Sequence, residues 1–219
     1  MISTMNTSAA RLASLALALA GASLLAACVP VLVGGAVAGG TMVAVDRRSA
    51  GTQVEDQTIE VRGASAASAL LGDRGNVSVT SYGRMALLTG EVPTAADKAA
   101  VEKAVAQVAN VRSTVNDLAV MPASSMTTRA NDSIITGKVK AQFVDTSDLQ
   151  VNSIKVVTER GIVYLMGRVT ETEAKRATEV ARSVGGVQKV VRVFEILTPS
   201  EVAAVQASVG AASQPAAKP

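Results

Sequence analysis

The alternation of hydrophobic and polar residues in positions 159–197 repeats the pattern of positions 82–120. Gly90 aligns with Gly167, and the valines that follow each glycine align as well, so the offset between the two stretches stays at 76 or 77 residues. A repeat with a nearly constant offset indicates one structural module that occurs twice. The second copy carries the stronger signals for helices and strands.

The second copy is predicted to begin with an amphipathic helix over residues 131–144, for which Asn131 or Asp132 would serve as the N-cap. The inward face of this helix is predicted to hold Ile135, Val139, Gln142 and Phe143. Two strands are predicted next, at 151–159 and 162–169, and the Arg-Gly pair between them is typical of a tight turn.

The strand at 162–169 is predicted to have two different faces, because successive side chains of a strand point to opposite sides of the sheet. The two faces are formed by Val163 and Leu165 on one side and by Ile162, Tyr164 and Met166 on the other. Thr170 and Glu173 then form a capping box that starts a second helix. Gly185 and Gly186 are predicted to close that helix, and a last strand follows at 187–196. The inward residues of the second helix are Ala174, Ala177, Ala181 and Val184.

The first copy repeats the order of helix, strand, strand, helix and strand with weaker signals. Its first helix is predicted at about 56–71, its strands at 76–82, 85–92 and 112–120, and its second helix directly after Pro93-Thr94. The inward residues of that second helix are Val101, Val105 and Val108, with Asn110 at the C-cap. The predicted fold is α+β, with two tandem αββαβ modules, each a three-stranded mixed sheet covered by two helices. Modules of this size are small, so we expect packing between them, or against a membrane, to stabilise both.

The N-terminal residues 1–27 are typical of a secretory signal peptide, with one positive charge, a short apolar stretch and small residues at the end. Cys28, the only cysteine of the chain, follows Leu-Ala-Ala directly, which resembles the lipobox of bacterial lipoproteins. The resemblance implies cleavage before Cys28 and acylation of this residue by fatty acids. Val29, rather than Asp, at the next position implies sorting to the outer membrane. The alternative is an ordinary signal peptide with an incidental free thiol.

The remaining boundaries follow from composition. Residues 28–45, the lipidated cysteine with an apolar, glycine-rich stretch, are interpreted either as a segment that contacts the bilayer or as a flexible tether. The two modules are expected at 46–121 and 130–198, joined by a linker at 122–129. A short helix, capped by the Thr-Pro-Ser-Glu stretch, and a solvated tail are expected over 199–219.

Composition excludes several classes of chemistry. The chain has no histidine and one cysteine, so disulfides, Cys/His metal sites and nucleophile–histidine pairs are ruled out, and no cofactor is expected. Asp145 and Asp148 fit turn and capping roles better than calcium binding. Only four aromatic side chains are present, which argues against a stacking platform for nucleic acid. The sequence therefore predicts that the protein is not an enzyme.

The order and spacing of the repeat resemble a pair of BON domains. The resemblance is strongest in "RGIVYLMGRVTETEAKRATEVARSVGGVQKV" at 160–190, and "VDRRSAGTQVED" at 45–56 is similar to the lead-in of dual-BON outer-membrane lipoproteins. It implies a non-enzymatic envelope protein that supports outer-membrane integrity. It also implies contact of the first helix of the second module with anionic lipid, and association with division sites and with outer-membrane protein assembly. A large aromatic residue is expected near position 134, where this chain has Ile134.

The residues of the 131–144 helix agree with a role in lipid binding. Its predicted outward face holds Ile134, Gly137, Lys138 and Ala141, with Lys140 at the flank. The second module is also the basic one, with 11 Lys/Arg against 8 Asp/Glu over 129–198, compared with 8 against 9 over 46–121. The alternative is that both lysines are merely solvated and Ile134 packs on the linker. A further set, Arg168, Lys189 and Arg192, faces either acidic residues of the first module or solvent, and we favour solvent.

The expected function is that of an outer-membrane lipoprotein facing the periplasm, which binds anionic phospholipid through its second module. Two alternatives are a protein–protein adaptor for an envelope or outer-membrane protein assembly complex and a passive osmotic-stress structural protein. Which of the first two applies depends on whether Ile134, Lys138 and Lys140 face lipid or protein.

Overall fold

The computed structural model describes residues 46–212, so the expected signal peptide, Cys28 and the glycine-rich tether lie outside the described residues. The first module consists of α2 (Ala50–Leu71), η2 (Gly72–Arg74), β1 (Asn76–Tyr82), β2 (Met85–Val92), α3 (Ala95–Ala106), β3 (Ser113–Asn116) and β4 (Ala119–Val120). The second module consists of α4 (Met126–Val144), η3 (Val151–Ser153), β5 (Ile154–Glu159), β6 (Ile162–Val169), α5 (Glu171–Ser183) and β7 (Lys189–Ile196). Helix α6 (Pro199–Ala212) follows. The predicted order of elements is confirmed in both copies.

Each module forms one mixed sheet with the same topology. In the first, β2 is central, antiparallel to β1 and parallel to β3 and β4; in the second, β6 is antiparallel to β5 and parallel to β7. The strand predicted at 112–120 is interrupted in the middle. Leu118 is 2% exposed within the core, and its backbone N–H donates to the Asn116 side chain instead of continuing the ladder.

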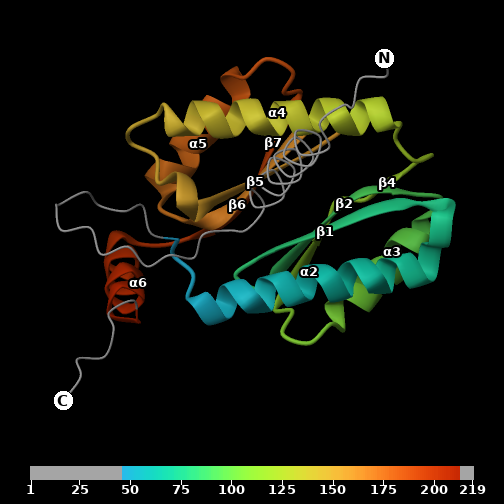
Figure 1. Ribbon diagram of the computed structural model, residues 1–219, viewed down its shortest axis with the longest axis horizontal. Helices are drawn as coiled ribbons and strands as arrows, with labels where there is room; N and C mark the ends of the chain where they lie inside the picture. Colours follow the sequence, from blue (N-terminus) through green and yellow to red (C-terminus); the bar gives the residue numbers. More distant parts are fainter. Residues whose placement is uncertain (1–45, 213–219) are drawn as a thin grey trace, which may run out of the picture. The chain divides into compact units, whose positions relative to one another are not determined.

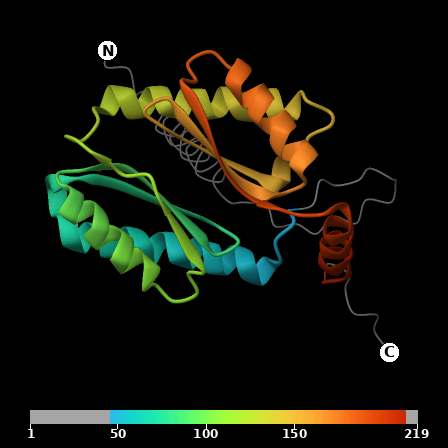
Figure 2. The ribbon, with the colours of Figure 1, turned by 180° about the vertical axis from the view of Figure 1, so that it is seen from behind.

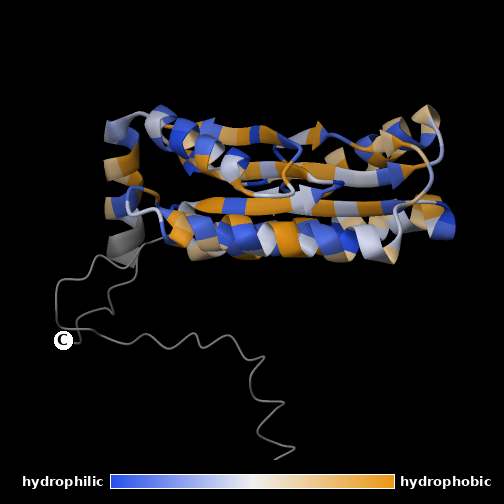
Figure 3. Cartoon of the chain, turned by 90° about the horizontal axis from the view of Figure 1, so that it is seen from above, coloured by the Kyte–Doolittle hydropathy of each residue, from blue (hydrophilic) through white to orange (hydrophobic). Residues whose placement is uncertain are grey.

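One face of each sheet is covered by the two helices of its own module (Figures 1 and 2). In the second module, the alternate residues Val163, Leu165 and Val169 of β6 join the core beneath α4 and α5. In the first, Ala86 and Leu88 of β2 occupy the same place beneath α2 and α3. Figure 3 shows hydrophobic stretches along the strands, between helices of mixed colour.

The other faces of the two sheets pack against each other. A third hydrophobic cluster joins residues of both modules, and its fully buried members are Leu87, Tyr164 and Met166. Burying a side chain of this kind contributes on the order of 1.5–3 kcal/mol. This packing explains why β6 has two different apolar faces, and the expected packing between the two modules is therefore found in the structure.

Polar contacts between the modules surround this cluster. The Tyr164 hydroxyl donates to Asp117 at 2.8 Å, and Arg160 of the second module pairs with the fully buried Glu91 of the first at 3.0 Å. Directional contacts of this kind fix the register between two faces that hydrophobic packing alone would leave free to slide.

The first helix of each module begins earlier than the sequence predicted. Ser49 and Ser125, 76 residues apart, are the N-caps, and each accepts a hydrogen bond from the backbone N–H of the threonine three residues later. Helix α2 therefore starts at Ala50 rather than near residue 56, and α4 starts at Met126 rather than at 131. The last residues of the expected linker thus belong to α4.

Three other local predictions differ from the structure. Asp132, a predicted cap, is 5% exposed within α4, and its carboxylate accepts hydrogen bonds from the backbone N–H groups of Arg160 and Gly161. Gln142 is exposed rather than inward, because it lies at the edge of the buried face. The C-caps are Gln107 and Val184, and the predicted capping residues Asn110 and Gly186 adopt positive φ angles shortly afterwards.

The strongest capping prediction is confirmed. Thr170 accepts from the backbone N–H of Glu173, and the Glu173 carboxylate accepts from the backbone N–H of Thr170 at 2.8 Å. Thr198 and Glu201 make the same reciprocal pair at the start of α6. Both helices are therefore fixed at their N-termini by short-range hydrogen bonds that the sequence encodes directly.

Candidate functional site

Helix α4 packs onto the second module through one face only. Ile135, Val139 and Phe143 are at most 2% exposed and belong to the core beneath the helix. With its 19 residues the helix is about 28 Å long, and successive residues turn by about 100°. The buried face therefore fixes which residues point away from the protein.

The face opposite the core is an uninterrupted apolar stripe. It consists of residues three or four positions apart, all of them exposed: Met126, Ala130, Ile134, Gly137, Ala141 and Val144. The three large members are 74%, 56% and 68% exposed for Met126, Ile134 and Val144, respectively. An exposed apolar stripe on a helix that already buries its other face is typical of an interaction surface. We call these six residues the α4 stripe.

Basic residues flank the α4 stripe. Lys138 and Lys140 are exposed on opposite sides of it. Arg129 lies near the start of the helix, where its guanidinium contacts the Met126 sulfur at 2.9 Å. The five residues predicted from the sequence to bind phospholipid, Ile134, Gly137, Lys138, Lys140 and Ala141, therefore all lie on the exposed side of α4. Sequence reasoning missed Met126, Ala130 and Val144, because it started the helix too late and ended the outward face too early.

A groove lies at the C-terminal end of the stripe. It has a volume of about 450 Å³ and a mainly apolar lining that includes Val144, Val151 and Ile154, and its basic lining residues are Arg48, Lys140 and Lys155. The stripe thus continues into a concave surface that carries positive charge.

Helix α2 provides an internal comparison, because it occupies the same place in the first module. Its outward positions, 76 residues before those of the stripe, hold Ala50, Val54, Thr58, Val61, Ser65 and Ser68. Three hydroxyl side chains interrupt the apolar surface there. Helix α2 carries one basic residue against three acidic ones, whereas α4 carries three basic residues against one acidic. The apolar stripe with basic flanks therefore belongs to the second module and is not a property of the fold.

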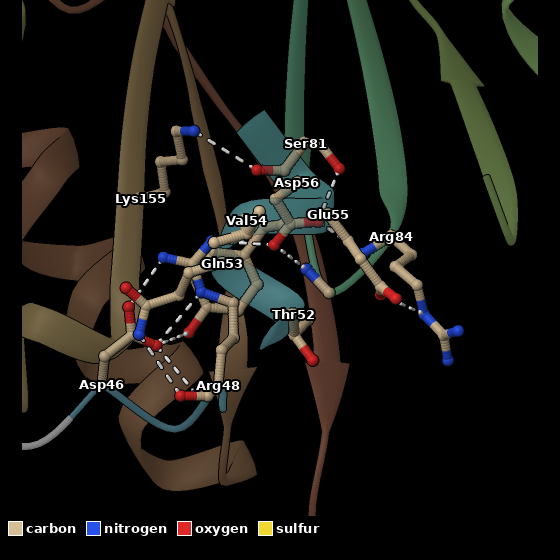
Figure 4. Close-up of polar contacts among 12 residues, drawn as sticks. Asp46, Arg48, Thr52, Gln53, Val54, Glu55, Asp56, Ser81, Arg84 and Lys155 are labelled. Carbon is tan, nitrogen blue, oxygen red and sulfur yellow. Dashed lines mark hydrogen bonds and ion pairs between the residues drawn. The ribbon is translucent and has the colours of Figure 1, made fainter. Parts of the chain in front are cut away.

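A buried carboxylate fixes the turn between β1 and β2 (Figure 4). Asp56, 2% exposed, accepts hydrogen bonds from the Ser81 hydroxyl and from the backbone N–H groups of Gly83 and Arg84, all within 2.8 Å. It also pairs with Arg48 at 2.8 Å. Burial alone would raise the pKa of the Asp56 carboxyl, but these four donors outweigh burial and lower the pKa below its usual value.

The same arrangement recurs in the second module, where Asp132 accepts from the turn between β5 and β6. Asp56 and Asp132 are 76 residues apart, the offset of the repeat. This correspondence was available from the sequence, but an aspartate in a helix gives no local signal that its carboxylate reaches a turn far away in the chain.

The three basic residues for which the sequence favoured contact with solvent, Arg168, Lys189 and Arg192, differ in exposure. Lys189 is exposed, and Arg192 is half exposed and pairs only with Glu171 of its own module at 3.6 Å. The solvated interpretation holds for these two. Neither interpretation describes Arg168, whose side chain is 27% exposed, donates to the Arg47 carbonyl and pairs with Glu195 of its own module at 3.4 Å.

Metal sites and membrane-spanning helices are both absent from residues 46–212. No group of three or more Asp, Glu, His or Cys side chains there lies close enough together to hold a metal ion. No helix in that range combines the length and hydrophobicity needed to cross a bilayer.

Comparison with known families assigns both modules. The BON domain family matches residues 48–122 and again residues 131–198, which together make up more than half of the chain. The chain belongs to the BON-domain family. The first match contains the complete αββαβ unit of its module, and the second contains the unit of its module from residue 131 of α4 onward, so the predicted resemblance to a pair of BON domains is confirmed.

Three relatives align with the chain over different lengths. The chain is 34% identical over 188 residues to the outer membrane lipoprotein DolP of Haemophilus influenzae, which covers 85% of this chain and 97% of that protein. It is 34% identical over 152 residues to a 21 kDa hemolysin of Actinobacillus pleuropneumoniae, or 68% of this chain and 78% of that protein. A shorter match, 41% over 61 residues, joins it to the osmotically inducible protein Y of Escherichia coli. The near full-length likeness to DolP supports a place among dual-BON outer-membrane lipoproteins.

Proposed function

We propose that this protein is an outer-membrane lipoprotein that faces the periplasm, binds anionic phospholipid through α4 of its second BON domain, and thereby supports the integrity of the outer membrane. The role is non-catalytic. The observation that carries the proposal is the α4 stripe with its basic flanks, which α2 lacks at the equivalent positions.

The stripe suits the boundary between headgroups and acyl chains. A helix lying in that plane buries its apolar side chains and turns its basic residues toward phosphates. The stems of Lys138 and Lys140 can lie along the apolar surface while their ammonium groups stay among the headgroups. Each basic residue near an anionic surface contributes on the order of 1 kcal/mol, so the three on α4 support weak, salt-sensitive binding.

Weak binding by α4 is sufficient if the chain is already anchored. We propose that Cys28 is acylated after cleavage of the signal peptide and that the lipid holds the BON domains near the membrane. A second contact from a tethered protein is an intramolecular event, which raises its effective concentration. The anchor would supply attachment, and α4 would supply the preference for anionic lipid.

The test is co-sedimentation of residues 46–219 with vesicles. This segment lacks Cys28 and contains the whole described unit with its three hydrophobic clusters. The vesicles are made of phosphatidylcholine alone or with phosphatidylglycerol, at low and physiological salt. We expect binding only to the anionic vesicles, weakened by salt.

Matched variants identify the helix. Ile134→Ser and Lys138→Glu on α4 are compared with Arg62→Glu on α2, since Arg62 occupies the position equivalent to Lys138. We expect the two α4 variants to lose anionic binding and the α2 variant to keep it. Equal losses in all three would refute a specific role of α4. Absence of binding by the unmodified segment would leave the membrane contact to the lipid anchor and would favour a protein partner instead.

A further inference from the structure

Five arginine side chains converge on one cavity at the boundary between the BON domains. The cavity has a volume of about 250 Å³ and a predominantly polar lining, to which α6 contributes one wall. The charged residues in the lining are Arg47, Arg48, Arg84, Arg112, Arg168 and Glu195. This volume suits a small polar group rather than a drug-sized ligand.

The two sheets bring these residues together. Arg84 and Arg112 directly precede the parallel strands β2 and β3, and the Arg112 backbone N–H donates to the Arg84 carbonyl at 2.8 Å. Arg168 and Glu195 are paired neighbours near the ends of the parallel strands β6 and β7. Because the sheets face each other, the start of one parallel pair meets the end of the other, and Arg112 reaches Glu195 at 3.1 Å.

The positive charge in the cavity is only partly compensated. Among the described residues, Glu195 is the only acidic one in the lining, and it pairs with both Arg112 and Arg168, at 3.1 and 3.4 Å. Arg84 has one distant, exposed partner, Glu55, at 3.8 Å. Of these three arginines, two share the Glu195 carboxylate, and Arg84 has no close carboxylate in the lining.

The two remaining arginines, Arg47 and Arg48, pair with acidic residues outside the cavity. Arg48 pairs with Asp46 and Asp56, and Arg47 pairs with Glu173 at 2.7 Å, none of which lines the cavity. Arg47 is only 3% exposed, and its buried Nε–H has no hydrogen-bond partner among the described residues. A buried donor without a partner is costly, and an acceptor within reach of this group would relieve that cost.

The repeat shows that the fold does not require this charge. At the opposite end of the sheets, Glu91 occupies the position equivalent to Arg168 and Gln188 the position equivalent to Arg112, and Arg160, the equivalent of Arg84, pairs with Glu91 at 3.0 Å. The excess of arginines is therefore found at one end of the boundary between the domains, whereas at the other end the equivalent arginine is neutralised by a buried carboxylate.

We propose that the arginine cavity binds a phosphate group. The phosphate takes the place of the Glu195 carboxylate between Arg112 and Arg168 and also contacts Arg84. Guanidinium groups bind phosphate through two parallel hydrogen bonds, and a phosphate monoester carries nearly two negative charges, more than the single charge of the carboxylate that now pairs with Arg112 and Arg168. The site is separate from the α4 stripe and does not depend on the function proposed for it.

The test is NMR of the arginine Nε–Hε groups in the full-length chain, held in neutral detergent micelles. The probes are glycerol 3-phosphate, with glycerol at matched ionic strength as its control, and micelles doped with phosphatidic acid. We expect saturable shifts of the Arg84, Arg112 and Arg168 signals, while the signal of the surface residue Arg62 stays unchanged. Saturation by glycerol 3-phosphate identifies a soluble phosphorylated ligand, whereas shifts only with phosphatidic acid identify a lipid headgroup.

Two variants make the result specific. Arg112→Gln is expected to weaken binding by about tenfold, and Glu195→Gln to strengthen it by about fivefold, because it removes the competing carboxylate. Arg62→Gln is the matched control and should change nothing. Absence of saturable shifts with both probes, or weaker binding by a folded Glu195→Gln variant, would overturn the proposal. Thermal unfolding of each variant separates loss of binding from loss of fold.

Discussion

Replacing Glu159 by glutamine should change how the stability of this protein depends on pH. Glu159 is 6% exposed at the boundary between the domains, and one of its carboxylate oxygens has no hydrogen-bond partner among the described residues. Burial, followed by the negative charges of Glu91 and Asp132, raises the pKa of its carboxyl to about 7, and the nearby Arg160 and Arg129 offset this only in part.

The direction and size of the effect follow from this pKa. Between pH 4.5 and 7, the folded protein keeps a proton on Glu159 that the unfolded chain has released. The free energy of unfolding therefore falls as the pH rises through this window, and the stabilisation present below pH 4.5 is lost above 7. A pKa of about 7 against an ordinary value of 4.5 corresponds to about 3 kcal/mol, a large part of the stability of a typical domain.

The assay is urea unfolding of the wild type and of Glu159→Gln between pH 5 and 8. The neutral amide should remove the contribution of this residue to the pH dependence. We expect the variant to be about 2–3 kcal/mol more stable than the wild type at pH 8 and nearly equal to it at pH 5. Glu179→Gln, at an exposed position on α5, is the matched control and should follow the wild type throughout.

Parallel stability curves for the wild type and Glu159→Gln across this range would refute the reasoning. They would show that Glu159 is ionised in the folded protein at pH 5 without cost, and hence that its surroundings are more polar than its burial indicates.

Two further substitutions test how the backbone and the turns are held. Gly90→Ala should destabilise the protein by about 3 kcal/mol or more, since φ is +111° there and an added Cβ would lie 2.0 Å from the Asn76 carbonyl oxygen. Urea unfolding would measure this loss of stability. The control is Gly137→Ala, whose added Cβ meets nothing within 4 Å and which should not be destabilising. Asp56→Asn should lower the free energy of unfolding by about 3 kcal/mol in the same assay, because an amide cannot accept from all the donors that surround this carboxylate. The substitution also removes one of the two anions that pair with Arg48. A loss of stability below about 1 kcal/mol would contradict the role assigned to this network.

The elements of both domains were predictable because their signals are local. The Thr170–Glu173 capping box and the alternation along β6 depend on residues a few positions apart, and both are found in the structure. The helix starts at Ala50 and Met126 were missed because their Ser-x-x-Thr caps lie before the amphipathic pattern becomes clear. The side of α4 that would face a membrane was also predictable, since its buried face follows from helical periodicity.

The sequence by itself determined that there are two BON domains, which face of each element is apolar, and that the second domain carries the basic helix. These properties follow from the periods of helices and strands and from residues close together in the chain. Only the tertiary structure decided that the second apolar face of each sheet covers the other sheet, that Glu159 is buried beside Glu91, and that arginines from both domains share one cavity with Glu195. Arg84 and Glu195 are brought together by packing between two sheets, and no periodic pattern along the chain encodes a contact across that distance.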